Sequence, residues 1–338
     1  MIAKQTSKHL VFGAGLIGGF VAGGLLNAGF TTAIVARARV KQELSQGLRL
    51  TDYQENSATL PPPDFISSEG SEVPAFDVLW LTVKCTAVAA CLQELADLIR
   101  PQTIIICCQN GLGSVQEVRE HFPEHTVLGA VVGYNVASPK SGHLHRSTEG
   151  KLVVENHPKI AEIVTRLDSG LFPTSLSDNF LGDQWAKLQL NLTNPVGALS
   201  DIPIKAMLEQ YDYRLIMVRL QKELLAVAAA LDISLPQLAA VPPAWIPRVL
   251  RLPDFLFKIV GQKMLTVDPT ARFSMWWDLD QNKPTEIHYL NDAVVKAAER
   301  TGLNAPVNER IVQLIRQVEA GERSIGYSGP ALRKALGI

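Results

Sequence analysis

The sequence predicts a two-domain α/β protein, in which a mostly parallel β-sheet flanked by helices precedes an all-helical domain. Uninterrupted apolar runs such as FDVLWLTVK and TIIICCQNG, which suit parallel strands buried on both faces, occur in the first half of the chain. From Asp183 onward, apolar residues instead recur at the three- and four-residue spacing of helices. The 338 residues are enough for two domains of ordinary size. We therefore predict a sheet domain over residues 1–182 and a helical domain over residues 183–338.

Composition narrows the class of protein and of partner. Hydrophobic residues make up 47% and charged residues 19%, which is typical of a compact globular protein, and the formal net charge is −1. This balance gives no reason to expect nucleic acid or a membrane surface as a partner. The four cysteines, Cys85, Cys91, Cys107 and Cys108, form no C-x-x-C pair, and no His cluster shows zinc-ligand spacing. We therefore predict buried free thiols in a reducing cytoplasm and no metal site.

The first chemical motif is a glycine-rich turn between the predicted strand HLVFGAG and the predicted helix LIGGFVAGGLLNAG. Its glycines follow the pattern G-x-G-x-x-G, and a second strand, TTAIVAR, comes next, which gives the βαβ context that this motif requires. Gly13 permits the tight turn, Gly15 lets a pyrophosphate approach the backbone, and Gly18 allows close packing of the helix on the strand. The sequence thus predicts a Rossmann-type domain whose helix N-terminus binds dinucleotide phosphates. The predicted cofactor-binding turn comprises Gly13, Ala14, Gly15, Leu16, Ile17 and Gly18.

An alternative for this segment is a membrane span. Residues 10–30 carry no charge, are long enough to cross a bilayer, and contain G-x-x-x-G steps at Gly15, Gly19 and Gly23. Against a span, the segment holds seven glycines, lacks an Ala-x-Ala cleavage pattern, and divides naturally into a strand and a helix closed by Gly29. We therefore predict a soluble domain without a membrane partner.

The residues after the second strand favour NADP(H) over NAD(H). An Asp or Glu about 20 residues after the glycines would accept hydrogen bonds from the ribose 2′-hydroxyl of NAD(H). This chain has Arg37 at the end of the strand, followed by Arg39 and Lys41, and no acidic residue before Glu43. Cations attract a phosphate, so we predict that Arg37 binds the 2′-phosphate of NADP(H).

Two polar side chains end the buried strands that follow. Lys84 closes FDVLWLTVK, and Asn110 with Gly111 closes TIIICCQNG. Ligands of open parallel sheets bind beyond the carboxyl ends of the strands. The matching positions of Lys84 and Asn110 on successive strands therefore predict that both point into the binding crevice. A surface lysine and a turn asparagine are the simpler interpretation of each residue taken alone.

From about Gly129, glycine and serine residues separate short segments whose composition is typical of β-strands. This pattern predicts antiparallel strands that extend the sheet. His143 and His145 alternate along one of these runs, and we interpret them as structural or exposed side chains rather than metal ligands. No internal repeat or low-complexity tract occurs in the chain.

The second half is predicted to be helical, with breaks at proline-rich stretches such as LPQLAAVPPAWIP and RLPDF. The segment Val241–Met264 is rich in Pro, Trp and Phe, and we interpret it as a packed irregular excursion rather than a linker. The predicted helices comprise Trp185–Leu192, Tyr211–Leu231, Glu286–Arg300 and Asn308–Ala320.

A polar stripe interrupts the first of these helices. In WAKLQLNLTNPVG, Lys187, Asn191 and Asn194 stand at spacings of four and three, which places them on one helical face. A solvated face usually carries more charge, whereas one amine and two carboxamides among leucines suggest a partly buried face. The spacing alone does not decide what this face contacts.

Two further polar features follow in FSMWWDLDQNKPTEIHYL. Ser274 and Asp278 are four residues apart and therefore share one helical face. Thr285 after Pro284 is typical of a helix N-cap, and Glu286 then falls in the first turn, where the helix dipole keeps a carboxylate ionised. A glutamate at this position can simply complement the positive end of the helix dipole, so its presence alone does not indicate a functional role.

Taken in order, these features resemble those of the ketopantoate reductase (2-dehydropantoate 2-reductase) family over nearly the whole chain. The resemblance implies an N-terminal Rossmann domain, a C-terminal helical domain and an active site in the cleft between them. It also implies reduction of a 2-keto acid to a 2-hydroxy acid by NADPH, on the pathway to pantothenate. The matching motifs, each weak alone, are GAGLIGG, Arg37 after the second strand, TVK with Lys84, QNGLGS with Asn110, KLQLNLTNP, Ser274 through Asp278, and PTEI with Glu286.

The resemblance assigns roles to the polar stripe and to the helix that follows it. Lys187 would donate a proton to the ketone oxygen, while Asn191 and Asn194 would hold hydroxyl and carbonyl groups of the substrate. Ser274 would bind the substrate carboxylate, with Asp278 nearby. Partial burial of Lys187 among leucines should lower the pKa of its amine from about 10.4 and so ease proton release.

The remaining implied roles concern the cofactor. Glu286 would contact it and orient Lys187, Asn110 would touch both the nicotinamide and the substrate, and Lys84 would bind the cofactor. The family commonly places the second Asn eight residues after the lysine, whereas here Asn194 follows Lys187 by seven. This departure leaves open whether 2-dehydropantoate or another branched 2-keto acid is the substrate, and a non-catalytic NADPH sensor is the other alternative. The sequence does not fix the oligomeric state, and a homodimer stays open.

Overall fold

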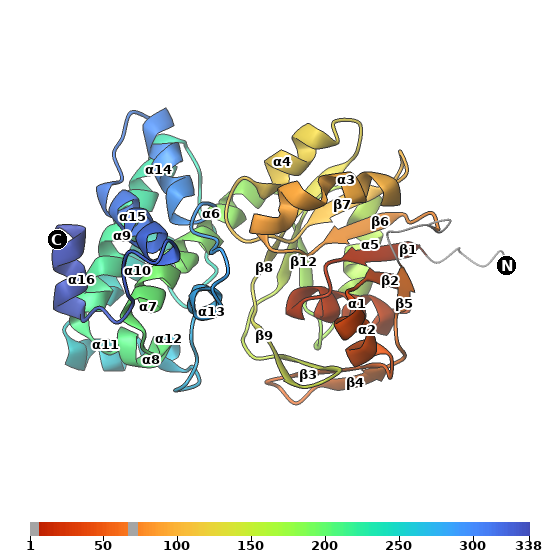
Figure 1. Ribbon diagram of the computed structural model, residues 1–338, viewed down its shortest axis with the longest axis horizontal. Coiled ribbons are helices and arrows are strands. Elements are labelled where there is room, and N and C mark those ends of the chain that lie inside the picture. The colour runs from red at the N-terminus through yellow and green to blue at the C-terminus, as the bar shows by residue number, and fades with distance from the viewer. Residues whose placement is uncertain (1–6, 67–73) are drawn as a thin grey trace. The chain divides into compact units, whose positions relative to one another are not determined.

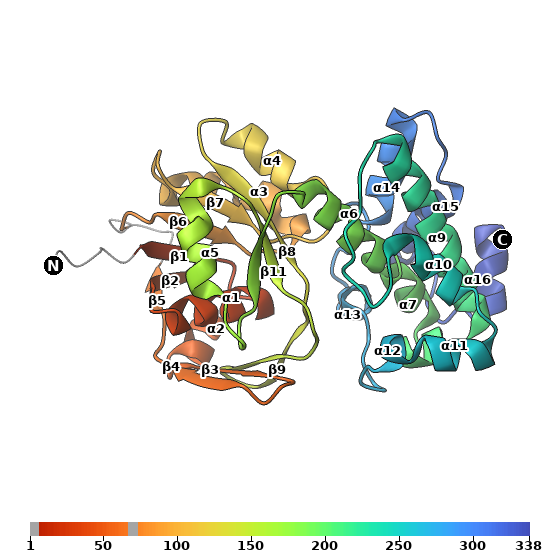
Figure 2. The same cartoon turned by 180° about the vertical axis from the view of Figure 1, so that it is seen from behind.

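The computed structural model describes residues 7–66 and 74–338. The described chain divides into two compact units, Met1–Phe180 and Leu181–Ile338 (Figures 1 and 2). The first unit combines β-sheets with helices and the second is helical, which confirms the predicted fold class. No helix within the described residues is long and apolar enough to cross a membrane.

The first unit is built around a central sheet. Its strands within the described residues are β1 (Lys8–Phe12), β2 (Thr31–Val35), β5 (Asp64–Ile66), β6 (Val78–Leu81), β7 (Ile104–Cys107), β8 (Val127–Val132), β11 (Leu152–Glu155) and β12 (Thr174–Ser177). They pair in the order β12-β11-β8-β7-β6-β1-β2-β5. The strands from β8 to β5 in this order run parallel, whereas β11 is antiparallel to β8 and parallel to β12.

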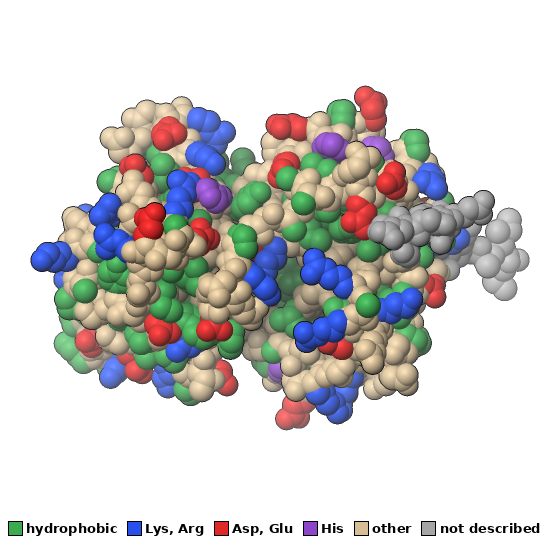
Figure 3. Space-filling view, viewed as in Figure 1, with side chains coloured by type: hydrophobic (Ala, Val, Ile, Leu, Met, Phe, Trp, Pro, Cys, Tyr) green, Lys and Arg blue, Asp and Glu red, His purple; other side chains and the backbone are tan. Residues whose placement is uncertain are grey.

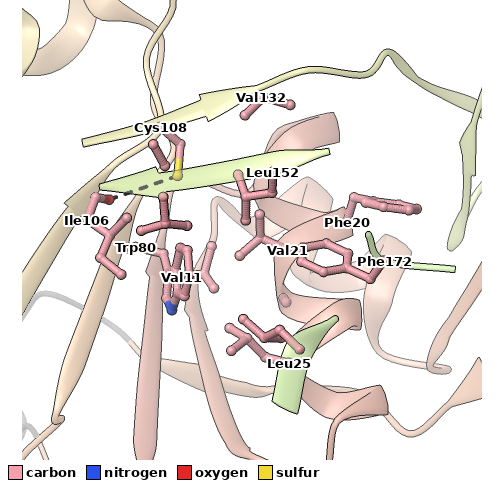
Figure 4. Close-up of a cluster of buried hydrophobic side chains, with 14 of the residues drawn as sticks. Val11, Phe20, Val21, Leu25, Trp80, Ile106, Cys108, Val132, Leu152 and Phe172 are labelled. Carbon is pink, nitrogen blue, oxygen red and sulfur yellow. Dashed lines mark hydrogen bonds between the residues drawn. The ribbon is translucent and has the colours of Figure 1, made fainter. Parts of the chain in front are cut away.

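Helices cover both faces of this sheet (Figure 1). They are α1 (Leu16–Asn27), α2 (Ala38–Leu44), α3 (Val88–Leu98), α4 (Ser114–His121) and α5 (Ala161–Leu167), with short 3-10 turns at Cys85–Ala87 and Pro158–Ile160. One buried cluster joins the sheet to α1 and α5 and includes Phe20, Leu25 and Trp80 (Figure 4). The opposite cluster joins the other face to α3 and α4. Because alternate strand residues point to opposite faces, strands covered on both sides are apolar throughout, as the predicted runs are.

A second sheet of the described residues packs against α1. Its strands, β3 (Leu48–Asp52), β4 (Ser57–Leu60), β9 (Val136–Lys140) and β10 (His143–Arg146), pair in the order β4-β3-β10-β9. The prediction of antiparallel strands that extend the main sheet after Gly129 is correct for β11, which pairs antiparallel with β8, and wrong for β9 and β10, which belong to the second sheet. The error arises because β10 pairs in parallel with β3, a segment far away in the sequence.

The two alternating histidines join strands of this second sheet. The Thr51 hydroxyl of β3 lies 2.7 Å from His143 Nε2 and 2.8 Å from His145 Nδ1 of β10. Within the described residues no group of His, Cys, Asp and Glu side chains is arranged to hold a metal ion. The hydrogen bonds to Thr51 therefore give both histidines the structural role that the sequence predicts.

A buried ion pair joins the last residues of β3 and β10 in the second sheet. Arg146 Nη2 lies 2.6 Å from Asp52 Oδ2, and the two side chains are 2% and 0% exposed. Arg146 also donates a hydrogen bond of 2.9 Å to the carbonyl of Gly170, and its guanidinium lies over the ring of Tyr53. The pair thus ties β3 and β10 to the loop that follows α5.

Glycines let α1 pack against the second sheet. A Cβ at Gly19 would lie 2.8 Å from a methyl carbon of Leu144, and a Cβ at Gly23 would lie 2.8 Å from a methyl carbon of Leu50. The G-x-x-x-G spacing therefore serves close contact between a helix and a sheet. The helix carries no charge because it is covered on opposite sides, by the central sheet and by the second sheet.

The second unit and the segment that leads into it are helical (Figure 2). The described helices are α6 (Phe180–Asn191), α7 (Asn194–Ser200), α8 (Ile204–Leu208), α9 (Tyr211–Ala230), α10 (Ile246–Leu250), α11 (Asp254–Val260), α12 (Gln262–Leu265), α13 (Ser274–Asp280), α14 (Asn291–Arg300), α15 (Pro306–Glu319) and α16 (Gly329–Leu336), with a 3-10 turn at Pro243–Trp245. The long helix α9 packs against α10, α14, α15 and α16 and so forms the centre of the unit.

The segment Val241–Met264 is packed, as predicted, but it is not irregular. It contains α10, α11 and most of α12, which are too short to show a helical period in the sequence. The fully buried Arg214 of α9 fixes it by donating hydrogen bonds to the carbonyls of Leu250 and Leu252, at 3.1 and 2.9 Å. The prediction that this segment is irregular is therefore wrong.

Candidate functional site

The turn between β1 and α1 gives its three motif glycines different roles. Gly13 has a φ of 107°, a left-handed conformation that favours glycine, and a Cβ there would come 2.7 Å from the backbone nitrogen of Val83. A Cβ at Gly18 would collide with the carbonyl oxygen of Gly13. At Gly15, by contrast, no described atom beyond Gly15 and its adjacent backbone lies within 4 Å of the Cβ position. The turn is therefore tightly packed at Gly13 and Gly18, and it leaves space for a ligand at Gly15.

The open side of this turn fits a phosphate group. Gly15 is exposed and directly precedes α1, and Leu16 and Ile17 form the start of that helix. The backbone N–H groups of a first helical turn have no partner within the helix, and they carry the positive end of its dipole. A helix N-terminus with such free N–H groups is the kind of site that binds phosphate in dinucleotide-binding proteins.

Two side chains that the sequence analysis missed brace this turn. The Thr82 hydroxyl, just after β6, donates a hydrogen bond of 2.6 Å to the carbonyl of Gly13. The Gln109 carboxamide, just after β7, donates to the carbonyls of Leu81 and Val83 at 2.8 and 3.0 Å. The signal in the sequence was a polar residue directly after each apolar run. Together these bonds hold the ends of β1, β6 and β7 in place.

Arg37 lies at the N-cap position of α2 and is exposed. Of the two other cations that follow the second strand, Arg39 forms an ion pair of 2.8 Å with Glu43, and the amine of Lys41 lies 5.7 Å from the centroid of the Phe65 ring. Figure 3 shows Lys and Arg side chains gathered on the viewed face of the first unit, over the region of α1 and α2. The surface around Arg37 is therefore suited to an anionic ligand.

Lys84 and Asn110 follow neighbouring strands, as the sequence predicts. β6 and β7 pair in parallel, with Leu81 opposite Cys107. Lys84 is exposed three residues after β6, and Asn110 is half-buried three residues after β7. Since β1 pairs in parallel with β6, the glycine turn lies at the same edge of the sheet. The structure therefore brings the segments that carry Lys84, Asn110 and the glycine turn together.

The polar stripe is carried by two helices rather than one. α6 ends at Asn191, and a two-residue turn separates it from α7, which begins at Asn194. Pro195 accounts for the break, because proline lacks the N–H that would bond to the carbonyl of residue 191 and because it suits the first turn of a helix. The prediction of one continuous helical face is therefore wrong, although Lys187 and Asn191 share a face of α6.

The side chains of the stripe have no internal partners. Within the described residues, no group forms a hydrogen bond or ion pair with the side chains of Lys187, Asn191 or Asn194. Lys187 and Asn191 are half-buried, and Asn194 is 8% exposed. Burial lowers the pKa of the Lys187 ammonium to about 8, because removal from water disfavours the charged form. The amine and carboxamide atoms of these three side chains still contact solvent, so they are available to a polar ligand.

Helix α13 presents Ser274 and Asp278 on one face, as predicted. Ser274 is exposed at the start of the helix, and Asp278 is buried. α13 packs against α7, and Gly197 permits this contact because a Cβ there would collide with the ring of Phe273. Phe273 directly precedes Ser274, and Gly197 lies one helical turn after Asn194. The structure therefore brings these two candidate substrate-binding segments together.

Glu286 lies in a turn rather than in the first turn of a helix. α14 begins at Asn291, so the predicted start of this helix at Glu286 is wrong. The Thr285 hydroxyl accepts a hydrogen bond of 3.3 Å from the backbone nitrogen of Ile287, as an N-cap would, but the residues that follow form only a turn before α14. Glu286 is buried, and the shift in the pKa of Lys187 is due to burial without a contribution from this carboxylate. The contact between Lys187 and Glu286 stays a prediction.

Comparison with known families matches the chain in two parts. The family model described as "Ketopantoate reductase PanE/ApbA" matches residues 9–159. The model described as "Ketopantoate reductase PanE/ApbA C terminal" matches residues 179–319. The two matches together cover most of the 338 residues, and they divide the chain where the sheet-containing unit gives way to the helical one.

Individual relatives agree with these matches. The 2-dehydropantoate 2-reductase of Archaeoglobus fulgidus is 24% identical over 326 residues, which span 94% of this chain and 99% of the relative. Among solved structures, a PanE/ApbA family ketopantoate reductase from Ralstonia eutropha JMP134 shares the fold, with a TM-score of 0.76 at 24% identity over 94% of this chain and 100% of that one. D-mandelate dehydrogenase with NADH and anilino(oxo)acetate has a TM-score of 0.73 at 20% identity, over 93% of this chain and 99% of that one.

Proposed function

Because the chain belongs to the ketopantoate reductase family, which consists of dinucleotide-dependent reductases, we propose that it reduces 2-dehydropantoate to pantoate with NADPH. The observation that carries this proposal is the amine of Lys187, which is half-buried, has no partner among the described residues, and has a pKa lowered to about 8. A group with a pKa near the working pH is suited to general acid catalysis. The carboxamides of Asn191 and Asn194 support the proposal, because they add polar groups that lack internal partners.

In this proposal the first unit holds the cofactor. Arg37 binds the 2′-phosphate, Lys84 binds the cofactor beyond β6, and Asn110 contacts the nicotinamide and the substrate. Glu286 would contact the cofactor and orient Lys187. Bound NADPH supplies the hydride that adds to the ketone carbon. The turn formed by Gly13, Ala14, Gly15, Leu16, Ile17 and Gly18 would hold the pyrophosphate.

The second unit binds the 2-keto acid and supplies the proton. Hydride addition places negative charge on the ketone oxygen, and the Lys187 ammonium stabilises this charge before it transfers a proton from Nζ. The carboxamides of Asn191 and Asn194 hydrogen-bond to hydroxyl and carbonyl oxygens of the substrate. The Ser274 hydroxyl donates to the substrate carboxylate, with Asp278 beside it. Holding both reactants in place lowers the barrier further, by several kcal/mol.

The preference for NADPH should depend on Arg37. We expect Arg37→Asp to weaken NADPH binding by about 10- to 100-fold and NADH binding far less, because a charged hydrogen bond to the 2′-phosphate contributes roughly 1.5–3 kcal/mol. Fluorescence titration of both nucleotides gives the two dissociation constants. Arg39→Asp is the matched control, since Arg39 is already paired with Glu43. Equal losses for NADPH and NADH would show that Arg37 does not bind the 2′-phosphate.

The pH dependence of the reduction should report the pKa of Lys187. The reaction needs the protonated amine, so kcat/KM is expected to be level at low pH and to fall as the pH rises through about 8. An ordinary lysine would stay protonated to a pH of about 10.4. Profiles of kcat/KM for the wild type and for Lys187→Arg measure this, because arginine keeps its proton over the whole range. The same alkaline decline in Lys187→Arg would assign it to another group.

Steady-state assays with NADPH and a panel of 2-keto acids test the proposed activity directly. Rapid turnover of 2-dehydropantoate is the expected result. Turnover of another branched 2-keto acid, with none of 2-dehydropantoate, would instead support a related reductase with a different substrate. Tight NADPH binding without turnover of any 2-keto acid would support the non-catalytic sensor.

A further inference from the structure

Helix α13 carries two adjacent tryptophans beside the proposed carboxylate-binding serine. Trp277 is 49% exposed, which is unusual for so large an apolar side chain, whereas Trp276 is half-buried. Residues three apart on a helix are separated by about 60° around its axis. Trp277 therefore lies next to Ser274 on the solvent side of the helix, and the buried Asp278 lies next to Ser274 on the other side.

The position of Trp277 is fixed by its neighbour. The Trp276 indole Nε1 donates a hydrogen bond of 2.7 Å to Asp201 Oδ1, at the end of α7. The Arg272 guanidinium lies 4.0 Å from the centroid of the Trp276 ring and forms an ion pair of 2.8 Å with the same Asp201 oxygen. The Trp277 ring packs edge-to-face on Trp276, with centroids 4.8 Å apart and planes at 82°. Trp277 is therefore held by an aromatic contact to an anchored ring, although its own surface is exposed.

If Ser274 binds the substrate carboxylate, this arrangement would place an indole beside the substrate. In a 2-keto acid the ketone carbon joins the carboxylate to the acyl substituent, so a carboxylate held at Ser274 leaves the substituent within reach of a large neighbouring side chain. Aromatic rings pack favourably against apolar groups and especially against other rings. The surface that Trp277 adds beside Ser274 is thus apolar, whereas Asn191 and Asn194 of α6 and α7 offer polar carboxamides.

We propose that Trp277 is a specificity-determining residue that extends the substrate range to 2-keto acids with an aromatic acyl substituent. The inference rests on the proposed function, because it takes Ser274 as the carboxylate-binding residue and the reduction of a 2-keto acid as the reaction. Trp277 takes no part in proton or hydride transfer; it binds the substituent.

The test compares kcat/KM for NADPH-dependent reduction of phenylpyruvate, pyruvate and 2-dehydropantoate. In the wild type we expect phenylpyruvate to be reduced with a higher kcat/KM than pyruvate. Trp277→Ala should lower kcat/KM for phenylpyruvate by about 10- to 100-fold and change that for pyruvate by less than about 2-fold, in the range that apolar pockets discriminate. Trp277→Phe should restore most of the preference. Trp245→Ala is the matched control, because Trp245 is a similarly exposed indole of the second unit, 54% exposed.

The outcomes separate the inference from the function on which it rests. If the wild type reduces 2-keto acids but Trp277→Ala lowers kcat/KM for phenylpyruvate and pyruvate equally, or for neither, the role of Trp277 is wrong and the proposed function stands. If the wild type reduces no 2-keto acid, both are wrong. Thermal unfolding of each variant identifies any general loss of structure, and Trp277→Phe keeps the comparison available if Trp277→Ala is unstable.

Discussion

Lys187→Ala is expected to lower kcat by about 10²- to 10⁴-fold, the usual effect of removing a general acid. The wild-type amine is half-buried on α6 with a pKa near 8, so it can stabilise the developing charge on the ketone oxygen and then release a proton. Alanine can do neither. NADPH affinity should stay largely unchanged, since the glycine turn and Arg37 belong to the other unit. Single-turnover kinetics and fluorescence titration measure the two quantities.

The control for this variant is Lys222→Ala, which removes an exposed lysine of α9. Its kcat should match that of the wild type, which would exclude an effect of lost net charge. Near-normal kcat in Lys187→Ala would exclude Lys187 from the chemistry. A large rise in the dissociation constant for NADPH would instead indicate that the lysine binds the cofactor.

Arg146→Ala is expected to reduce the free energy of unfolding by about 3–5 kcal/mol, the usual effect of breaking a buried ion pair from one side. The substitution leaves the fully buried Asp52 carboxylate without its cation and removes the hydrogen bond to the carbonyl of Gly170. Since total stabilities are typically about 5–15 kcal/mol, such a loss is a large share of the total and would clearly lower the denaturant concentration at the midpoint of unfolding. Chemical denaturation followed by circular dichroism measures the change.

Arg49→Ala is the comparison for this variant, because Arg49 is an exposed arginine of the same sheet. Its free energy of unfolding should change by less than about 0.5 kcal/mol, as for most surface substitutions. A similar loss in both variants would mean that the ion pair adds nothing beyond what any arginine of the sheet contributes.

The elements that the sequence predicts well are those decided by local chemistry. Gly13, Gly15 and Gly18 are recognisable because each meets a constraint within the turn itself. Gly13 has a left-handed φ, Gly15 leaves room beside the backbone, and Gly18 lies against the carbonyl of Gly13. The parallel strands are predictable because burial on both faces requires an uninterrupted apolar run. Ser274 and Asp278 share a face because the four-residue spacing lies within one helix.

The errors arise where contacts distant in sequence override a local signal. Thr285 has the chemistry of an N-cap, yet α14 starts only at Asn291, and the backbone nitrogen of Thr285 donates a hydrogen bond of 2.7 Å to the distant Glu319 Oε1 of α15. The pairing of β10 with β3 is likewise invisible to any local pattern. The break between α6 and α7 is different, because a local signal predicts it. Pro195 favours a new helix start, whereas the spacing of Lys187, Asn191 and Asn194 favours one continuous helix.

The covering of α1 on opposite sides has a consequence for the kinetics of nucleotide association. A helix confined by a sheet on either side cannot reorient when a ligand arrives, so the turn that leads into it is already ordered before encounter. We therefore expect little conformational entropy to be lost at this turn when a nucleotide docks, and no rearrangement of the turn to slow association. Gly19 and Gly23 allow this close packing because they have no Cβ, and they thereby help to preorganise the phosphate-binding turn.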